Sequence, residues 1–132
     1  MSGCTLDTDV MIAALDRADA HHAEAKAALG ELIEERSALL ISTVNYAEAL
    51  VRPAAKPETL EAAVDAIAAL GVEPIAPTPS IARDAARHRG LGISLADGFA
   101  LATAQAAGTT VASFDKRVLR AAEQLEIPLG IS

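Results

Sequence analysis

The sequence has very few cysteine and aromatic residues. Its 132 residues include one cysteine, Cys4, no tryptophan, two phenylalanines and one tyrosine. A single cysteine excludes an internal disulfide and any zinc site built from several cysteines, so we expect Cys4 to be a small apolar residue of a strand. With 52% hydrophobic residues, the chain is long enough to bury an aliphatic core as one domain spanning residues 1–132.

Long hydrophobic runs are also missing. No apolar stretch approaches the roughly 18 residues that a membrane-spanning helix needs. The beginning of the sequence has neither the charged segment nor the long apolar segment of a secretory signal peptide. These absences predict a cytoplasmic protein that does not associate with membranes.

Positive charge is scarce. Eleven Lys and Arg residues face 18 Asp and Glu residues, which gives a net charge of −7. A protein that coats nucleic acid needs the opposite balance, because its surface must neutralise phosphates. An enzyme that meets phosphates through bound cations stays possible, because a metal ion reverses the local electric field.

Short apolar runs alternate with longer segments of helical periodicity. Strands are predicted at residues 4–6, 38–41, 72–75, 110–112 and 127–131, and helices at 8–17, 21–35, 43–51, 57–70, 80–89, 94–107 and 115–125. Because the strands are continuously apolar, they predict a mostly parallel central sheet of about five strands, covered by helices on both faces. Pro128 suits an edge strand. The predicted fold is a three-layer α/β/α domain.

Four acidic residues fall where such a sheet binds ligands, outside the carboxyl ends of its strands. Asp7 and Asp115 follow predicted strands, Asp97 lies in the first turn of a helix, and Glu48 lies in the helix after the second strand. Asp9 follows Asp7 so closely that two charges at roughly 4 Å would repel by about 4 kcal/mol at an effective dielectric near 20. Carboxylates gathered at one edge need cations, and hard divalent ions with oxygen ligands fit best.

Each acid also has a purely structural interpretation. Asp7 or Asp9 is a possible helix N-cap, Asp115 is another, and Ser94 with Asp97 has the S-x-x-D form of a capping box. Glu48 is equally compatible with an ordinary exposed position on a helix. The four positions together, rather than any one of them, favour a metal site.

These motifs resemble, in order and spacing, the PIN domain family, and in particular the VapC-type ribonuclease toxins of bacterial VapBC toxin–antitoxin pairs. The segments that carry the resemblance are "LDTDV", "STVNYAEAL", "LADGFALATAQA" and "SFDKRVL". The resemblance implies a PIN-like fold and an endoribonuclease whose Asp7, Glu48, Asp97 and Asp115 are catalytic and hold one or two Mg²⁺ or Mn²⁺ ions. It further implies an RNA substrate, a VapB-like antitoxin as partner, and a homodimer.

Supporting roles follow from the same resemblance. Ser113 would orient the last carboxylate or the attacking water, and Thr8 would support the site. Asp9 stands where the family more commonly has Asn, so it either adds a charge behind the metal ligands or caps the helix. No Ser–His–Asp or Cys–His arrangement is evident. The histidines are interpreted as surface residues, and five cations are candidates for contacting RNA phosphates: Arg83, Arg87, Arg89, Lys116 and Arg117.

Two alternatives remain open at this point. "DTDV" also fits the D-x-D-x-[TV] opening of haloacid-dehalogenase-like phosphatases, with Asp7 as the nucleophile and Asp9 as the acid/base, and Lys116 as a possible later lysine. A PIN-like module that binds RNA or a partner without cutting is the other alternative. The intact set of four acids favours the enzyme.

Overall fold

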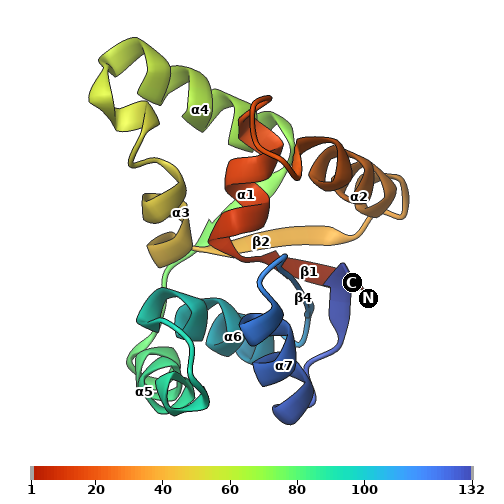
Figure 1. The fold of residues 1–132 in the computed structure, drawn as a ribbon, viewed down its shortest axis with the longest axis vertical. Helices are drawn as coiled ribbons and strands as arrows, with labels where there is room; N and C mark the ends of the chain where they lie inside the picture. The colour runs from red at the N-terminus through yellow and green to blue at the C-terminus, as the bar shows by residue number, and fades with distance from the viewer. Residues whose placement is uncertain (1, 132) are drawn as a thin grey trace.

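The computed structural model describes residues 2–131 as a five-stranded sheet with helices on both faces (Figure 1). The strands are β1 (Gly3–Leu6), β2 (Ala38–Ser42), β3 (Val72–Ile75), β4 (Thr110–Ala112) and β5 (Leu129–Ile131). The α-helices are α1 (Thr8–Leu15), α2 (His22–Glu34), α3 (Thr43–Ala49), α4 (Pro57–Ala69), α5 (Pro79–His88), α6 (Leu95–Ala107) and α7 (Lys116–Gln124). Two 3₁₀ turns, η1 (Pro53–Ala55) and η2 (Arg89–Leu91), precede α4 and α6.

The strand order is β3-β2-β1-β4-β5, and all neighbouring strands are parallel. In the centre, Cys4 of β1 is in register with Leu39 on one side and Thr110 on the other. The predicted sheet is therefore confirmed and is parallel throughout the described residues. β5 lies at an edge, as predicted, and Pro128 falls just before it, where its carbonyl accepts a hydrogen bond from the Val111 N–H at 3.0 Å.

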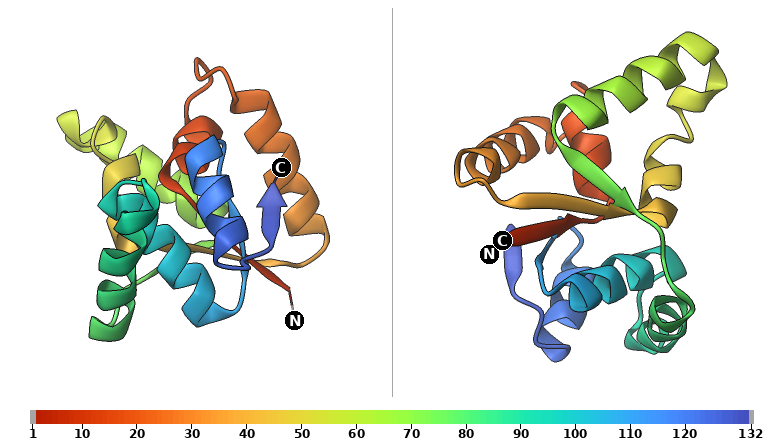
Figure 2. Two further views of the ribbon diagram at one scale, coloured as in Figure 1. Left: turned by 60° about the horizontal axis from the view of Figure 1, so that its bottom comes forward. Right: turned by 180° about the vertical axis from the view of Figure 1, so that it is seen from behind.

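The helices form two layers around the sheet. Helices α1, α2 and α4 lie on one side, and α5, α6 and α7 on the other (Figures 1 and 2). Helix α3 contacts both α1 and α6 and so joins the two layers. The side chains between the layers are aliphatic and small, and Cys4 is buried among them. The three-layer prediction is confirmed.

Helix ends follow local sequence signals. The Ser42, Thr78 and Ser94 side chains cap α3, α5 and α6, and Pro57 occupies the first turn of α4, where its missing N–H costs nothing. Gly108, with φ of 68°, ends α6 in the left-handed conformation that glycine adopts without strain. The predicted helices therefore agree with the observed ones to within a few residues.

One prediction about the histidines is wrong. His21 is exposed and His22 half-buried, but His88 is buried, with Nε2 2.6 Å from Oε1 of Gln105 on α6. His88 lies on the same face of α5 as Ile81 and Ala85, and this face packs against α6. His88 is buried because it follows those apolar residues at helical spacing, and the arginines around it do not change this.

No helix in residues 2–131 combines the length and apolarity needed to cross a bilayer.

Candidate functional site

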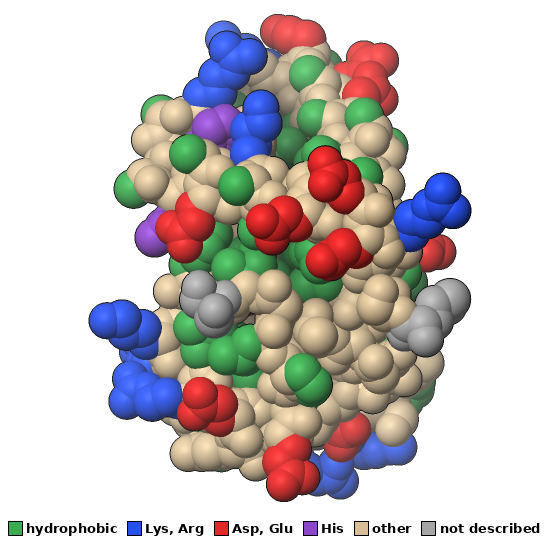
Figure 3. Space-filling view, turned by 90° about the vertical axis from the view of Figure 1, so that its right-hand side faces the viewer, with side chains coloured by type: hydrophobic (Ala, Val, Ile, Leu, Met, Phe, Trp, Pro, Cys, Tyr) green, Lys and Arg blue, Asp and Glu red, His purple; other side chains and the backbone are tan. Residues whose placement is uncertain are grey.

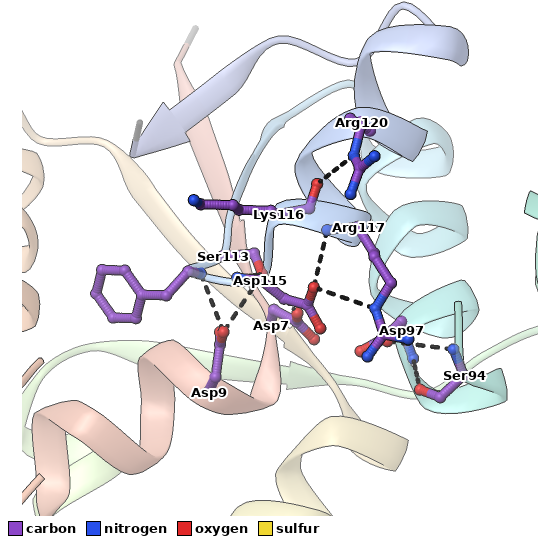
Figure 4. Close-up of polar contacts among 10 residues, drawn as sticks. Asp7, Asp9, Ser94, Asp97, Ser113, Asp115, Lys116, Arg117 and Arg120 are labelled. Carbon is purple, nitrogen blue, oxygen red and sulfur yellow. Dashed lines mark hydrogen bonds and ion pairs between the residues drawn. The ribbon is translucent and has the colours of Figure 1, made fainter. Parts of the chain in front are cut away.

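The candidate site lies at the carboxyl ends of β1 and β4, where the strand order of the sheet reverses. From β1 the chain adds β2 and then β3 on one side, whereas β4 and β5 lie on the other side. In open parallel sheets, ligands bind in the crevice formed at such a reversal. Asp7 directly follows β1 and Ser113 directly follows β4, and both side chains point into this region (Figure 4).

Asp7 is a buried carboxylate held by hydrogen bonds. Its side chain is 1% exposed, and its two oxygens accept hydrogen bonds from the Thr8 N–H at 2.9 Å and the Ser113 hydroxyl at 2.8 Å. Burial raises the pKa of Asp7 to about 7, the charges of Asp9 and Asp97 add to the shift, and the two hydrogen bonds oppose it. No salt bridge in residues 2–131 involves Asp7. A cation at this position would relieve the repulsion.

Asp9 is hydrogen-bonded to the loop that carries Ser113. One oxygen of its carboxylate accepts a hydrogen bond from the Phe114 N–H at 3.0 Å, and the Ser113 hydroxyl lies 3.5 Å away. Its other oxygen is buried and finds no hydrogen-bond partner among the described residues. Burial raises the pKa of Asp9, backbone hydrogen bonds oppose the shift, and Asp115 and Asp97 add to it. Asp9 is therefore not the helix cap, which is Asp7.

Asp97 and Asp115 face the same region but are also hydrogen-bonded at the starts of their own helices. Asp97 accepts a hydrogen bond from the Ser94 N–H at 3.2 Å and completes the predicted capping box. Asp115 caps α7 by accepting from the Arg117 N–H at 2.8 Å, and the Arg117 Nε lies 3.9 Å from the same oxygen. The prediction that these two acids cap helices is thus confirmed. Capping leaves their remaining carboxylate oxygens for a ligand.

Glu48 is exposed on α3 and linked to the others through Thr8. Its Oε1 accepts a hydrogen bond from the Thr8 hydroxyl at 2.7 Å, and Thr8 is the residue after Asp7. The supporting role that the family resemblance implies for Thr8 agrees with this contact and stays a prediction. The sequence did not identify Asn45, which donates to the Thr8 hydroxyl at 3.0 Å. The available signal was spacing, since Asn45 precedes Glu48 by three residues and so shares its side of the helix.

The donor set fits a hard divalent ion in kind, although it is not already arranged around one. The carboxylates offer only oxygen ligands, which Mg²⁺ and Mn²⁺ prefer. Within residues 2–131, however, no three Asp, Glu, His or Cys side chains lie close enough together to hold one ion. The Asp97 and Asp115 carboxylates are each hydrogen-bonded at the start of their own helix, α6 and α7. The carboxylates would have to come closer together to hold one ion.

Cations are sparse around the site. Lys116 and Arg117 are exposed at the start of α7, next to Asp115 (Figure 4). Three further arginines, Arg83, Arg87 and Arg89, are exposed on α5 and η2, where Arg87 pairs with Asp84. On the face in Figure 3, blue side chains stand in small separate groups rather than in one basic patch. This distribution agrees with the exclusion of a protein that coats nucleic acid.

A groove opens beside Glu48. Its volume is about 800 Å³, and its lining residues come from α1, α3, η1 and the start of α4. The apolar lining includes Ile12, Leu15 and Val51, and the Val51 side chain is 70% exposed. Asp16, Asp19 and Glu48 supply acidic groups at the same groove, and Arg52 and Lys56 supply basic ones. Its apolar side chains, and its acidic groups that outnumber the basic ones, suit an amphipathic segment that carries positive charge.

Comparison with known proteins places this site in a family context. A family model described as PIN domain matches residues 4–124, and a comparison with curated proteins finds no match. The fold is similar to VapBC2 from Rickettsia felis bound to a DNA fragment from their promoter (TM-score 0.73, 18% identity, 96% of each chain covered). It is also similar to Mycobacterium tuberculosis VapC20, described as a sarcin-ricin loop cleaving toxin (TM-score 0.70, 19% identity, 90% of this chain and 95% of that chain).

A third similar structure is FitAcB from Neisseria gonorrhoeae, with a TM-score of 0.67 and 23% identity over 96% of this chain and 95% of that chain. At such identities these likenesses concern the fold. The family match favours the nuclease interpretation of the acidic cluster over the phosphatase alternative built on Asp7 and Asp9.

Proposed function

Because the chain belongs to the PIN domain family, we propose that it is a metal-dependent endoribonuclease and the toxin of a toxin–antitoxin pair. The reaction is the hydrolysis of RNA phosphodiester bonds with Mg²⁺ or Mn²⁺. The description of VapC20 as a toxin that cleaves the sarcin-ricin loop supports RNA as the substrate class. The proposal extends to a homodimer, as the family resemblance implies.

The observation that carries the proposal is the environment of Asp7. A carboxylate that is 1% exposed, placed beside two further acids and without a salt bridge in residues 2–131, destabilises the protein unless a cation joins it. Its position outside the ends of β1 and β4 is where a parallel sheet binds ligands. A purely structural role for Asp7 would need only the helix cap, which does not require the neighbouring charges.

Asp7, Glu48, Asp97 and Asp115 would hold the ion. When bound, a divalent ion supplies a polarised phosphoryl oxygen and an attacking water of lowered pKa. Ser113 orients Asp7 by donating its hydroxyl hydrogen. Lys116 and Arg117 at the exposed start of α7 are the nearest cations to bind the flanking RNA phosphates.

The partner side of the proposal is a VapB-like antitoxin. Several similar structures are toxin–antitoxin complexes, including the one from Klebsiella pneumoniae, which is 24% identical to this chain. The groove beside Glu48 fits an apolar, positively charged antitoxin tail. An arginine from that tail would reach the acidic cluster and bind a carboxylate in bidentate fashion, in place of the metal.

The test is cleavage of structured RNA by the purified chain with Mg²⁺ or Mn²⁺ and with EDTA. Metal-dependent cleavage that is lost in Asp7→Asn supports the proposal. A small phosphate ester is assayed in parallel: its hydrolysis without RNA cleavage would establish the phosphatase alternative. RNA binding without cleavage at any metal concentration would identify a binding module instead.

A further inference from the structure

A buried amide joins the three helices that carry Asp7, Glu48 and Asp97. Asn45 of α3 is 0% exposed. Its Nδ2 donates one hydrogen bond to the Thr8 hydroxyl at 3.0 Å and another to the Ala96 carbonyl at 3.0 Å. The Thr8 hydroxyl in turn donates to Glu48 Oε1 at 2.7 Å.

The direction of this chain of hydrogen bonds is fixed by chemistry. The Ala96 carbonyl can only accept, so the Asn45 atom beside it must be the nitrogen. The carboxylate of Glu48 can also only accept, so the single hydrogen of the Thr8 hydroxyl points to it. Thr8 must therefore accept from Asn45. Turning the amide over would bring its oxygen against two acceptors, so one orientation of Asn45 is enforced.

The partners of Asn45 are neighbours of the candidate ligands. Thr8 directly follows Asp7, and Ala96 directly precedes Asp97. Helix α3 contacts both α1 and α6 (Figure 1), so one side chain fixes the spacing between all three. Apart from the bonds made through Asn45 and Thr8, the acids at the site are held at the starts of their own helices or by the loop of residues 113–115.

Packing alone does not explain an asparagine here. The Oδ1 atom of Asn45 is buried and has no hydrogen-bond partner among the described residues. An unpaired buried acceptor destabilises the folded state, so an apolar side chain of the same size would serve the core better. The benefit of Asn45 lies in its two donated hydrogen bonds.

We propose that Asn45 is a positioning residue that holds α1, α3 and α6 at a fixed spacing, and so sets the positions from which Glu48, through Thr8, and Asp97, through Ala96, close on the divalent ion. The inference rests on the proposed function, since it concerns the same metal site. It assigns to Asn45 no contact with the ion or with RNA. Loss of a group that is hydrogen-bonded to a metal ligand weakens metal binding by about 10- to 100-fold, and Asn45 orients such a group, the Thr8 hydroxyl bonded to Glu48.

The test compares Asn45→Leu, which keeps the number of side-chain atoms and removes both donors, with Thr103→Val. Thr103 is a suitable control because it is buried on α6 and its hydroxyl has no hydrogen-bond partner among the described residues. Mn²⁺ binding to the full chain is measured by titration calorimetry, with circular dichroism to verify folding. We expect a dissociation constant raised by about 10- to 100-fold in Asn45→Leu and unchanged in Thr103→Val. Unchanged Mn²⁺ affinity in a folded Asn45→Leu protein would overturn the inference.

A double-mutant cycle distinguishes the positioning of Glu48 by Asn45 from a general loosening of the structure. If Asn45 acts through Glu48, Asn45→Leu adds less to the loss of Mn²⁺ affinity in a Glu48→Gln background than in the wild type. Fully additive losses would contradict the relay. Thr8→Val breaks the same relay at a half-buried position, so it decides the question if Asn45→Leu does not fold; wild-type Mn²⁺ affinity in Thr8→Val would then overturn the inference.

Failure of the proposed function gives a different pattern. If the wild-type chain binds no Mn²⁺ and cleaves no RNA, the proposed function falls and the inference falls with it. If the wild type binds Mn²⁺ and cleaves RNA while the Asn45 and Thr8 variants do so equally well, only the inference is wrong.

Discussion

The Ser113 hydroxyl donates a hydrogen bond to the buried carboxylate of Asp7 at 2.8 Å, across a sequence separation of 106 residues. The same hydroxyl accepts the Asp115 N–H at 3.1 Å. One small side chain therefore connects the end of β1 to the start of α7. Asp9 strengthens the connection by holding the Phe114 N–H. This loop, residues 113–115, connects Asp115, the last of the four candidate ligands along the chain, to the end of β1, where Asp7 lies.

The first prediction concerns cleavage. Asp7→Asn, Glu48→Gln, Asp97→Asn and Asp115→Asn each remove one negative charge from the cluster with little change in shape, so each should abolish RNA cleavage while the fold survives. Asparagine also keeps helix-capping ability. Gel assays with structured RNA and circular dichroism provide the measurements. Asp65→Asn, an exposed acid on α4, is the control and should cleave normally. Retained cleavage in both Asp7→Asn and Asp97→Asn would refute the site.

The second prediction concerns metal and stability. A cation that binds only the folded chain at 100 times its dissociation constant adds about 2.7 kcal/mol to the free energy of unfolding. For a domain of this size, the melting temperature should rise by on the order of ten degrees. The measurement is thermal unfolding with Mn²⁺ against EDTA. Asp7→Asn should lose most of the rise. A melting temperature that Mn²⁺ leaves unchanged in the wild type would argue against a shared metal site.

The third prediction concerns pH in the absence of metal. The pKa of Asp7 is raised from 3.8 to about 7 in the folded protein, so between these values the folded chain holds a proton that the unfolded chain has lost. The contribution of Asp7 to stability is therefore fully present below about pH 4 and is lost as the pH rises through 7. In EDTA, Asp7→Asn should match the wild type near pH 4 and exceed its unfolding free energy by on the order of 4 kcal/mol at pH 8. Urea unfolding across this range tests it, and an equal pH dependence in both proteins would contradict it.

The fourth prediction concerns inhibition by a basic tail. If the proposed function holds, a synthetic peptide with apolar residues and one arginine, of the kind proposed for the antitoxin tail, should stop RNA cleavage and release Mn²⁺ together. Its association rate should fall as salt rises, because the chain carries a charge of −7. Val51→Asp in the groove should weaken peptide binding, whereas Leu91→Asp, an exposed apolar position on η2, should not. Inhibition with the Mn²⁺ still bound would show that the peptide blocks RNA instead of displacing metal.

The fifth prediction concerns the close approach of α5 and α6. A Cβ atom at Gly98 would lie 2.6 Å from the Ala85 carbonyl oxygen, whereas at Gly30 of α2 it would meet nothing within 4 Å. Both glycines are helical, so alanine improves helix propensity equally at each. Gly30→Ala should therefore stabilise the protein by up to about 1 kcal/mol, and Gly98→Ala should destabilise it by about 1–3 kcal/mol. Equal effects in urea unfolding would show that α5 moves away without cost.

Local features of the fold were predictable from the sequence. Buried strands and helix starts depend on neighbouring residues, so "ALLI" predicted β2 and Ser94 predicted the start of α6. Strand order was not predictable, because the pairing of Cys4 with both Leu39 and Thr110 depends on how the layers pack. The burial of His88 was misjudged because nearby arginines outweighed the helical spacing from Ala85.

The acidic residues of the candidate site were predictable from the sequence, and the hydrogen bonds that join them were less predictable. The positions of Asp7 and Asp115 after strands follow from the alternating pattern, and their helix-capping contacts follow from local geometry. The contact of Asp9 with Phe114 joins residues 105 positions apart, so no local pattern reveals it. Asn45 was missed because a buried amide on a helix has no distinctive sequence signature.

The pairing of the first strand with the fourth has a consequence for synthesis on the ribosome. β1 lies between β2 and β4, and the Asp7 N–H donates to the Ala112 carbonyl at 2.9 Å. A nascent chain whose first 109 residues have emerged can pair β1 with β2, but it has neither β4 nor the loop that anchors Asp7. Chains lengthen by roughly 5–20 residues per second during translation, so several seconds or more separate the synthesis of β1 from that of β4. The acidic cluster of a growing chain therefore stays incomplete throughout this interval.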